Sequence, residues 1–402
     1  MIDDQEQVDL LNEYQDIVSS VLRIDDFTLG DKKQRFLVRY RGNLRYTDSA
    51  GAYELLAQKL RPFDITPLLR WEEDRIAVEL VQGSPKPSRS NPWINLILFF
   101  VTLLSVGLTG ALYGMDGPLP EGLWPSILLI FSRGWPFAIS MLSILGAHEF
   151  GHYLVGRYHG VNVSLPYFIP LPFSPFGTMG AFINMKEPPK NRRVLLDIGI
   201  AGPLAGLVVS IPVLLIGLSL SSVDVLPMMS PEGMTFQLEG NSILYLLAKF
   251  AVFGQLLPAP ADYGHLGPVL YWVRYFVTGR PFPLGGVDVL LHPVAWAGWA
   301  GLLVTAMNLI PAGQLDGGHL LYVLIGRKRA QRIFPMILIF LVIMGLVWPG
   351  WWLWAALIFF LGRAYAEPLD QVTPLDERRK LLAVLGLVIF ILTFTPVPLS
   401  IF

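Results

Sequence analysis

Long apolar runs are the feature that most limits what this chain can fold into. A helix needs about 20 apolar residues to cross the hydrocarbon core of a bilayer. We find six candidate spans, at residues 93–113, 135–156, 198–220, 291–310, 333–364 and 381–396. The dipeptide Pro349-Gly350 interrupts the fifth run, which is therefore either one broken span or a tight hairpin. The number of predicted spans is accordingly six to seven.

Composition supports the same class of protein. Charged residues make up 15% of the 402 residues, against roughly 25% in ordinary soluble domains, and the mean hydropathy is +0.51. The sequence predicts an all-α polytopic membrane protein in contact with the lipid bilayer. The absence of cysteine excludes disulfides and cysteine ligands. The net charge of −1 gives no sign of a nucleic-acid partner.

The beginning of the chain has a different character. Charged clusters are frequent there, residues 5–22 have helical spacing, and "RFLVRYRGNLRY", "ITPLLRW" and "RIAVELV" read as strands. These patterns predict a small soluble α+β domain, followed by a linker rich in Pro and Ser. The predicted division is a soluble domain, a linker and a membrane-embedded domain, at residues 1–82, 83–92 and 93–402.

Basic residues in the short loops predict the orientation in the membrane. Lys and Arg are frequent before the first span, after the second and after the fourth, whereas the loop "MDGPLPEG" after the first span is acidic. The N-terminal domain and the loop 311–332 therefore share the cytoplasmic side. The short run 241–257 carries Lys249 and reads as an interfacial or re-entrant helix within a peripheral insertion, residues 221–288.

The motif H-E-F-G-H lies inside the second predicted span. On a helix, His148 and His152 are one turn apart on the same face, so both imidazoles can reach one ion. Glu149 then lies beside the metal and can take a proton from its bound water. Chance, or histidines satisfied within a helix bundle, is the alternative. Ionisable groups at membrane depth are costly and usually functional, which favours a zinc site.

A catalytic zinc ion normally has three protein ligands and a water. The best candidate for the third is Asp316 in "NLIPAGQLDGGHLL", because it follows the fourth span on the same side of the membrane as the histidines. Gly313, Gly317 and Gly318 would let the backbone leave a regular helix there. A simple turn is the alternative for this segment, and His319 is the rival ligand.

Together these motifs resemble the site-2 protease family of intramembrane zinc metalloproteases. HEFGH in one span and "NLIPAGQLDGGH" after a later one match the family pattern. "SLPYFIPLPFSPFGTMGAFI" is similar to its membrane-associated strand region, and "DIGIAGPLAGLVVS" to the start of its third core span. The resemblance covers roughly residues 135–325 and is closest to bacterial and chloroplast-type members. It implies a short membrane-associated β segment beside the helices.

The resemblance also implies roles for individual residues. His148, His152 and Asp316 match the Zn²⁺ ligands, and Glu149 matches the general base. Asn308 matches a family asparagine that helps to hold substrate or oxyanion near the metal; packing between helices is its alternative. The substrate-binding strand region corresponds to Gly177, Thr178 and Gly180. The apolar run "GTMGAFINM" contains no Pro, so it can serve as a strand edge that pairs with an unwound substrate. No segment reads clearly as a PDZ module.

The predicted function is hydrolysis of peptide bonds in or near transmembrane segments of membrane proteins, as in regulated intramembrane proteolysis. The alternatives are a zinc-stabilised, non-catalytic membrane binding protein and a metal transporter. We find neither the internal repeat nor the second metal motif typical of transporters. The expected location is a bacterial plasma membrane or a thylakoid-like membrane. Three roles are open for the N-terminal domain, which could filter substrates, bind a partner or only stabilise the fold.

Overall fold

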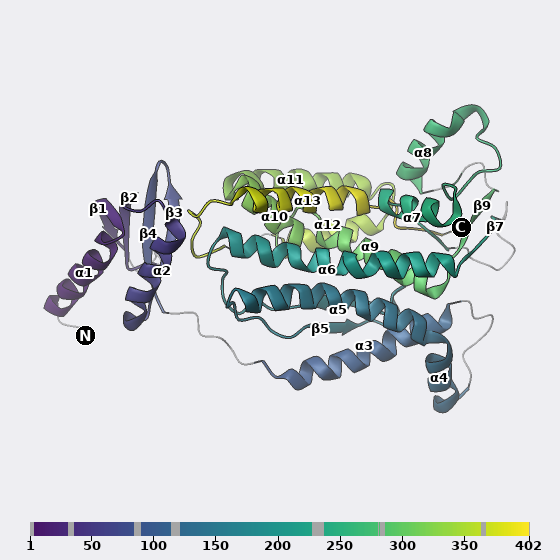
Figure 1. Ribbon diagram of the computed structural model, residues 1–402, viewed down its shortest axis with the longest axis horizontal. Helices are drawn as coiled ribbons and strands as arrows, with labels where there is room; N and C mark the ends of the chain where they lie inside the picture. Colours follow the sequence, from purple (N-terminus) through teal and green to yellow (C-terminus); the bar gives the residue numbers. More distant parts are fainter. Residues whose placement is uncertain are drawn as a thin grey trace.

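The computed structural model comprises a small α+β part at one end and a helical body that makes up most of the length (Figure 1). It describes residues 4–30, 36–83, 90–113, 121–226, 237–279, 281, 286–362 and 367–401. Most of the predicted linker, residues 84–89, lies outside the described residues, as do parts of the predicted insertion at 227–236, 280 and 282–285.

The N-terminal part is an antiparallel sheet with strand order β1-β2-β4-β3. Its elements are α1 (Asp4–Ser19), β1 (Leu22–Leu29), β2 (Val38–Leu44), α2 (Ser49–Leu60), β3 (Ile65–Glu72) and β4 (Arg75–Gln82). Both helices contribute to one apolar core with the inward face of the sheet. The sequence did not reveal β1, because a β-bulge between Ile24 and Asp26 breaks its alternation.

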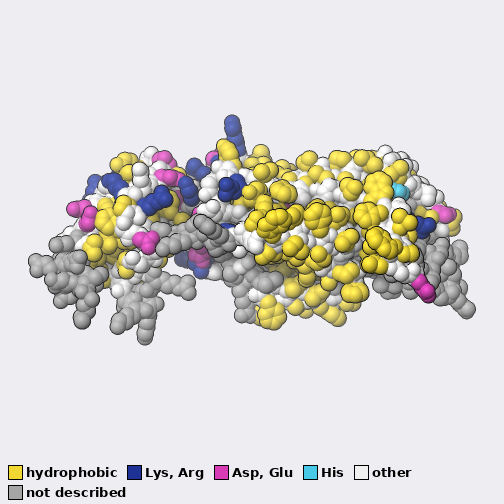
Figure 2. Space-filling model, turned by 90° about the horizontal axis from the view of Figure 1, so that it is seen from below, with side chains coloured by type: hydrophobic (Ala, Val, Ile, Leu, Met, Phe, Trp, Pro, Cys, Tyr) yellow, Lys and Arg dark blue, Asp and Glu magenta, His cyan; other side chains and the backbone are white. Residues whose placement is uncertain are grey.

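On the face seen in Figure 2, hydrophobic side chains cover most of the helical body, whereas charged side chains gather over the N-terminal part. The principal helices of the helical body are α3 (Pro92–Leu112), α5 (Trp135–Tyr158), α6 (Arg192–Ser219), α9 (Pro293–Asn308), α10 (Asp316–Ile325), α11 (Arg327–Met344), α12 (Gly350–Leu361) and α13 (Glu377–Thr393). Such a surface suits a membrane protein, since lipid tails can solvate it.

Three helical segments of the described chain are long and apolar enough to cross a membrane. They are Pro92–Leu112, Leu123–Tyr158 and Arg192–Ser219. The second joins α4 (Leu123–Leu129), the π-helical turn η2 (Ile130–Gly134) and α5. The later predicted spans form shorter helices or, in α11, a helix that begins with a basic turn. The break at Pro349 divides the run 333–364 into α11 and α12, which pack against each other.

Helices α5, α6 and α9 form the centre of the body, and small residues let them approach closely. A Cβ on Gly298 of α9 would lie 2.6 Å from the Cα of Leu214 in α6. One on Gly301 would lie 2.5 Å from the Oγ of Ser210. Lipid tails are as apolar as leucine, so helices in a membrane associate through close packing of small residues. The "AWAGWAG" stretch of α9 serves this purpose.

A two-stranded hairpin lies beside α3 (Figure 1). It consists of β5 (Tyr167–Pro170) and β6 (Thr178–Phe182), in antiparallel register. The side-chain amide of Asn95 in α3 donates to the carbonyls of Leu165 and Pro166, each at 2.9 Å. The hydroxyl of Ser105 donates to the carbonyl of Gly177 at 2.5 Å. These bonds satisfy polar backbone groups that lipid could not.

The predicted insertion lies at the end of the body opposite the N-terminal sheet (Figure 1). It contains β7 (Ser222–Val225), β8 (Gln237–Glu239), α7 (Ile243–Phe253), η3 (Gly264–Leu266), α8 (Gly267–Thr278) and β9 (Val287–Leu290), and β8 pairs with β10 (Leu399–Ile401). Lys249 is fully buried between Glu239 and Asp288, at 3.5 and 3.4 Å. The placement of α7 at a membrane interface stays a prediction.

The segment 367–373 joins the N-terminal sheet to the helical body. The backbone N–H of Leu69 in β3 donates to the carbonyl of Leu369, and the N–H of Gln371 donates to the carbonyl of Leu69, both at 3.0 Å. The segment therefore adds to the edge of the sheet in parallel orientation. A covered edge cannot pair with another chain.

The other side of the same segment pairs with the chain that leads into α6. The N–H of Leu369 donates to the carbonyl of Pro189 at 3.0 Å, and that of Asp370 to the carbonyl of Lys190 at 2.8 Å. Asn191 follows and caps α6 by accepting from the N–H of Val194. The segment 367–373 thus links the N-terminal sheet, by backbone hydrogen bonds, to the chain that enters α6.

We expect Asp370→Asn to weaken this joint. The Asp370 carboxylate is fully buried and accepts bonds from the N–H groups of Val372 and Thr373 and from the Thr373 hydroxyl. Exchanging one oxygen for an amide should cost about 1–3 kcal/mol of stability. The melting temperature of the full chain should fall and trypsin should cut near the joint faster. Asp224→Asn, at an exposed position, is the control; an equal effect there would contradict the assignment.

Candidate metal centre

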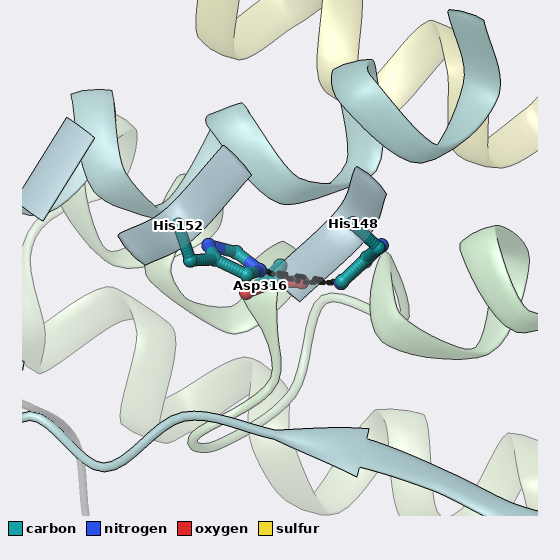
Figure 3. Close-up of side chains that lie close together, drawn as sticks. All are labelled: His148, His152 and Asp316. Carbon is teal, nitrogen blue, oxygen red and sulfur yellow. Dashed lines mark hydrogen bonds and ion pairs between the residues drawn. The ribbon is translucent and has the colours of Figure 1, made fainter. Parts of the chain in front are cut away.

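Helix α5 presents His148, Glu149 and His152 within the body. The three side chains are only 3–6% exposed. The i, i+4 spacing places both imidazoles on one face of the helix. Asp316, the first residue of α10, approaches that face from the segment after α9 (Figure 3). The two parts of the site are thus 164 residues apart in sequence, counted from His152 to Asp316.

The three side chains converge on one point. The Nε2 atoms of His148 and His152 are 3.2 Å apart, and each lies 3.4 Å from Oδ2 of Asp316 (Figure 3). Each offers one ligand atom, and all three ligand atoms lie within 4.8 Å of one another. The structure therefore brings together the three residues that the sequence nominated as ligands.

This arrangement fits a zinc ion. Zinc–nitrogen and zinc–oxygen distances of about 2.0–2.2 Å in tetrahedral geometry place neighbouring ligand atoms roughly 3.3–3.5 Å apart, and the observed separations are 3.2 and 3.4 Å. Two histidines and one carboxylate form a ligand set that catalytic zinc commonly takes. With three protein ligands, a fourth position stays open for water or substrate.

Helix α6 orients His152 and leaves space for both imidazole rings. The Nδ1 atom of His152 lies 2.7 Å from the carbonyl oxygen of Ile198, so a proton on Nδ1 is donated there and Nε2 is left free to bind a metal. Space for the rings comes from two glycines. A Cβ on Gly202 would lie 2.0 Å from Nε2 of His152, and one on Gly206 would lie 3.2 Å from Nδ1 of His148.

Two further polar groups border the metal centre. Glu149 follows His148 on α5, and its side chain is buried. The side-chain amide Nδ2 of Asn308, at the end of α9, lies 3.2 Å from Nε2 of His148. A proton acceptor and an amide therefore lie beside the point where the ligand atoms converge.

A cavity of about 390 Å³ opens onto these groups. Its lining includes the three candidate ligands, Glu149, Asn308 and residues 181–185. One edge of β6 pairs with β5, and the strand and its continuation form a wall of the cavity. Residues 181–185 are the second half of "GTMGAFINM", the run that the sequence predicts as a strand edge for substrate.

The three predicted substrate-binding residues do not line this cavity. Gly177 has φ +70° and packs on α3, where a Cβ would lie 2.6 Å from the Cα of Val106. Thr178 is buried, and its hydroxyl donates to the carbonyl of Ile169 at 2.7 Å. Gly180 has φ +106° and open space around its Cα. All three shape the hairpin, and their contact with a substrate stays a prediction.

Three glycines around Asp316 were expected to let the backbone leave a regular helix, and one of them does so. Gly313 does turn the chain, with φ +58°. Gly317 and Gly318, however, lie within the first turn of α10 rather than breaking it. A Cβ on Gly317 would lie 1.9 Å from the carbonyl oxygen of Leu309. Close approach of α10 to the end of α9 explains these glycines, and it is this approach that brings Asp316 to the histidines.

The other histidines have separate roles. His319 lines the cavity, but it does not belong to the converging group. His159 lies 3.0 Å from Asp197 and His292 caps α9. His265 lies in a short 3₁₀ turn.

Comparisons with known proteins agree with this site. The family model described as "Peptidase family M50" matches residues 136–347, which is 212 of the 402 residues. The chain belongs to peptidase family M50, the site-2 protease family. The matched region begins at the second residue of α5 and includes both histidines, Asn308 and Asp316. The family resemblance seen in the sequence is thereby confirmed.

Relatives within the family point to the same chemistry. The "Probable zinc metalloprotease EGY2, chloroplastic" of Arabidopsis thaliana is 30% identical over 275 residues, 68% of this chain and 44% of the relative. The "Probable zinc metalloprotease EGY1, chloroplastic" of Oryza sativa subsp. japonica is 28% identical over 397 residues, 89% and 62% of the two chains. This family M50 chain spans about half the length of the curated relatives it matches. No solved structure matches it.

We expect Gly202→Ala to weaken zinc binding without altering a ligand. The added Cβ would meet the ring of His152 at 2.0 Å and displace it from α6. Loss of the supporting geometry around a zinc ligand typically costs 10–100-fold in affinity. The measurement is a zinc titration of the purified full chain against a competing chelator. Gly146→Ala, where no atom lies within 4 Å of the added group, is the matched control and should bind as the wild type does.

Proposed function

We propose that this chain is an intramembrane zinc endopeptidase that cleaves peptide bonds in or near transmembrane segments of membrane proteins. The observation that carries the proposal is the convergence of His148, His152 and Asp316 within 4.8 Å, with Glu149 buried beside them, inside an apolar helical body. Membership of a peptidase family and relatives named zinc metalloproteases support it. The substrate class and the site of cleavage are part of the proposal.

In the proposed hydrolysis, each polar group at the site has a separate chemical role. When bound by the three ligands, zinc supplies a Lewis acid that polarises a peptide carbonyl and acidifies water. Glu149 takes the proton from the attacking water at its carboxylate and delivers it to the leaving amine. Glu149 and Ile183, which follows β6, line the same cavity. The Asn308 amide donates to the oxygen on which negative charge develops.

A helical substrate must first lose its internal hydrogen bonds, since these occupy its peptide carbonyls. We propose that residues 181–185 take over those bonds by accepting the unwound substrate as an added strand. Their position on the cavity wall supports this role. The strand bonded to the scissile segment would then lie directly beside Glu149.

We also propose that the later apolar helices complete six to seven spans. The exposed apolar side chains of α11, α12 and α13 support this placement. We propose that the metal centre and the N-terminal sheet both face the cytoplasmic side. The short stretch of chain between the cavity lining at Met185 and the pairing of Pro189 and Lys190 with the segment 367–373 supports this placement. We likewise propose the division into domains at residues 82 and 92, and a partner for the N-terminal domain.

Glu149→Gln tests the proposed reaction. The variant should retain zinc, because the ligands are unchanged, and should cleave a single-span substrate in proteoliposomes at least 10²–10⁴-fold more slowly than the wild type. The control is chelation of the wild type followed by added zinc, which should remove and restore cleavage. Undiminished cleavage by Glu149→Gln would sink the proposal. A wild type that binds zinc but cleaves no substrate would favour the non-catalytic alternative.

Asn308→Ala separates oxyanion stabilisation from metal binding. Removing one donor to a developing negative charge typically lowers kcat by about 10²–10³-fold. Zinc content should stay at the wild-type value, since Asn308 is not among the converging ligands. The measurement is kcat together with zinc per chain. Loss of zinc in parallel with activity would instead assign Asn308 to holding His148.

A further inference from the structure

A second cavity, of about 600 Å³, lies where the N-terminal sheet meets the helical body. Its lining comes from β3, the start of α6, the end of α10 and the start of α11. Five basic side chains line it and Glu73 is the one acid in the lining; the bases are Arg70, Arg192, Arg327, Lys328 and Arg329. A volume of this size is within the range of small-ligand sites. Nothing in the proposed protease chemistry uses it.

Most of this positive charge is not neutralised by the described chain. Arg327 pairs with Glu367 at 2.7 Å, and Arg70 donates through one nitrogen to backbone carbonyls, including that of Pro368 at 2.9 Å. Among the described residues, no ion pair involves Arg192, Lys328 or Arg329.

One of these groups is both buried and unsatisfied. The terminal amine of Arg192 donates to the carbonyl of Val323, but its Nε is buried without a hydrogen-bond partner in the described structure. Leaving a buried charged donor unpaired is costly. The Arg192 guanidinium also has no ion-pair partner among the described residues, so an anion in the cavity would compensate its charge. Phosphate is an anion that arginine and lysine clusters are suited to bind.

The position of the cavity favours a lipid as the source of the phosphate. Lys328 and Arg329 lie in the first turn of α11, and the same helix exposes Met336, Ile339 and Phe340 further along. The first of these is about 12 Å from Lys328 along the axis. Trp71, 54% exposed, also lines the cavity, as an aromatic anchor at a membrane surface would. A headgroup in the cavity could thus continue into acyl chains along α11.

We propose that this cavity binds the phosphate headgroup of an anionic lipid. Basic pockets at the cytoplasmic ends of membrane helices are suited to such headgroups. The bound headgroup would contact the sheet through Arg70 and the helical body through Arg192 and Arg329. It would therefore fasten the N-terminal sheet to the membrane surface at the same joint that segment 367–373 forms.

The test compares lipid binding by two charge-matched variants of the full chain in neutral detergent. The site variant is Lys328→Gln/Arg329→Gln. The control is Arg378→Gln/Lys380→Gln, which removes two exposed basic residues from the start of α13, outside the cavity lining. The readout is the rise in melting temperature on titration with phosphatidylglycerol, with phosphatidylcholine and inorganic phosphate as separate probes.

Phosphatidylglycerol should stabilise the wild type and phosphatidylcholine should not. Each basic residue near anionic lipid contributes about fivefold in affinity, so the site variant should need roughly 30-fold more lipid for half of the effect. The control variant should stay within about twofold of the wild type. Equal weakening of both variants would overturn the proposal, because general surface charge would then explain binding. Equal protection by phosphatidylcholine would also overturn it, and inorganic phosphate acting at the same concentration would overturn the lipid assignment.

Discussion

The close approach of α6 to the histidine face of α5 is the constraint on which the metal centre depends. Two imidazole rings occupy the space that side chains would fill at Gly202 and Gly206, and the carbonyl of Ile198 orients one of them. A larger residue at either glycine would separate the helices or displace the rings. In a body held together by packing rather than by a hydrophobic driving force between helices, such contacts also carry much of the stability.

The polar groups that converge at the metal centre are buried and lie against one another. The Asp316 carboxylate faces two imidazoles, and Nδ1 of His152 lies 2.7 Å from the carbonyl oxygen of Ile198. An unpaired charge in an apolar interior is expensive, so these contacts hold the site in one arrangement. The same contacts limit the positions in which a metal and a proton acceptor can lie together, which suits the chemistry that we propose.

The cavity wall is continuous with the joint to the N-terminal sheet. Residues 181–185 line the cavity, and the chain then runs to 189–191, which pair with the segment 367–373 and lead into α6. The basic cavity adjoins the same joint through Arg70 and Arg192. One hydrogen-bonded stretch of backbone thus connects the N-terminal sheet with the wall of the cavity.

The sequence by itself determined the features that depend on local spacing. Helical periodicity placed His148 and His152 on one face, and the order of apolar and basic segments favoured Asp316 as the third ligand, with His319 as its rival. Only the tertiary structure shows which strand residues line the cavity. It also shows that Gly202 of α6 leaves space for the ring of His152. These features arise from contacts between segments far apart in the chain. Local sequence patterns cannot predict such contacts, because a glycine required for packing and a glycine in a turn look the same in sequence.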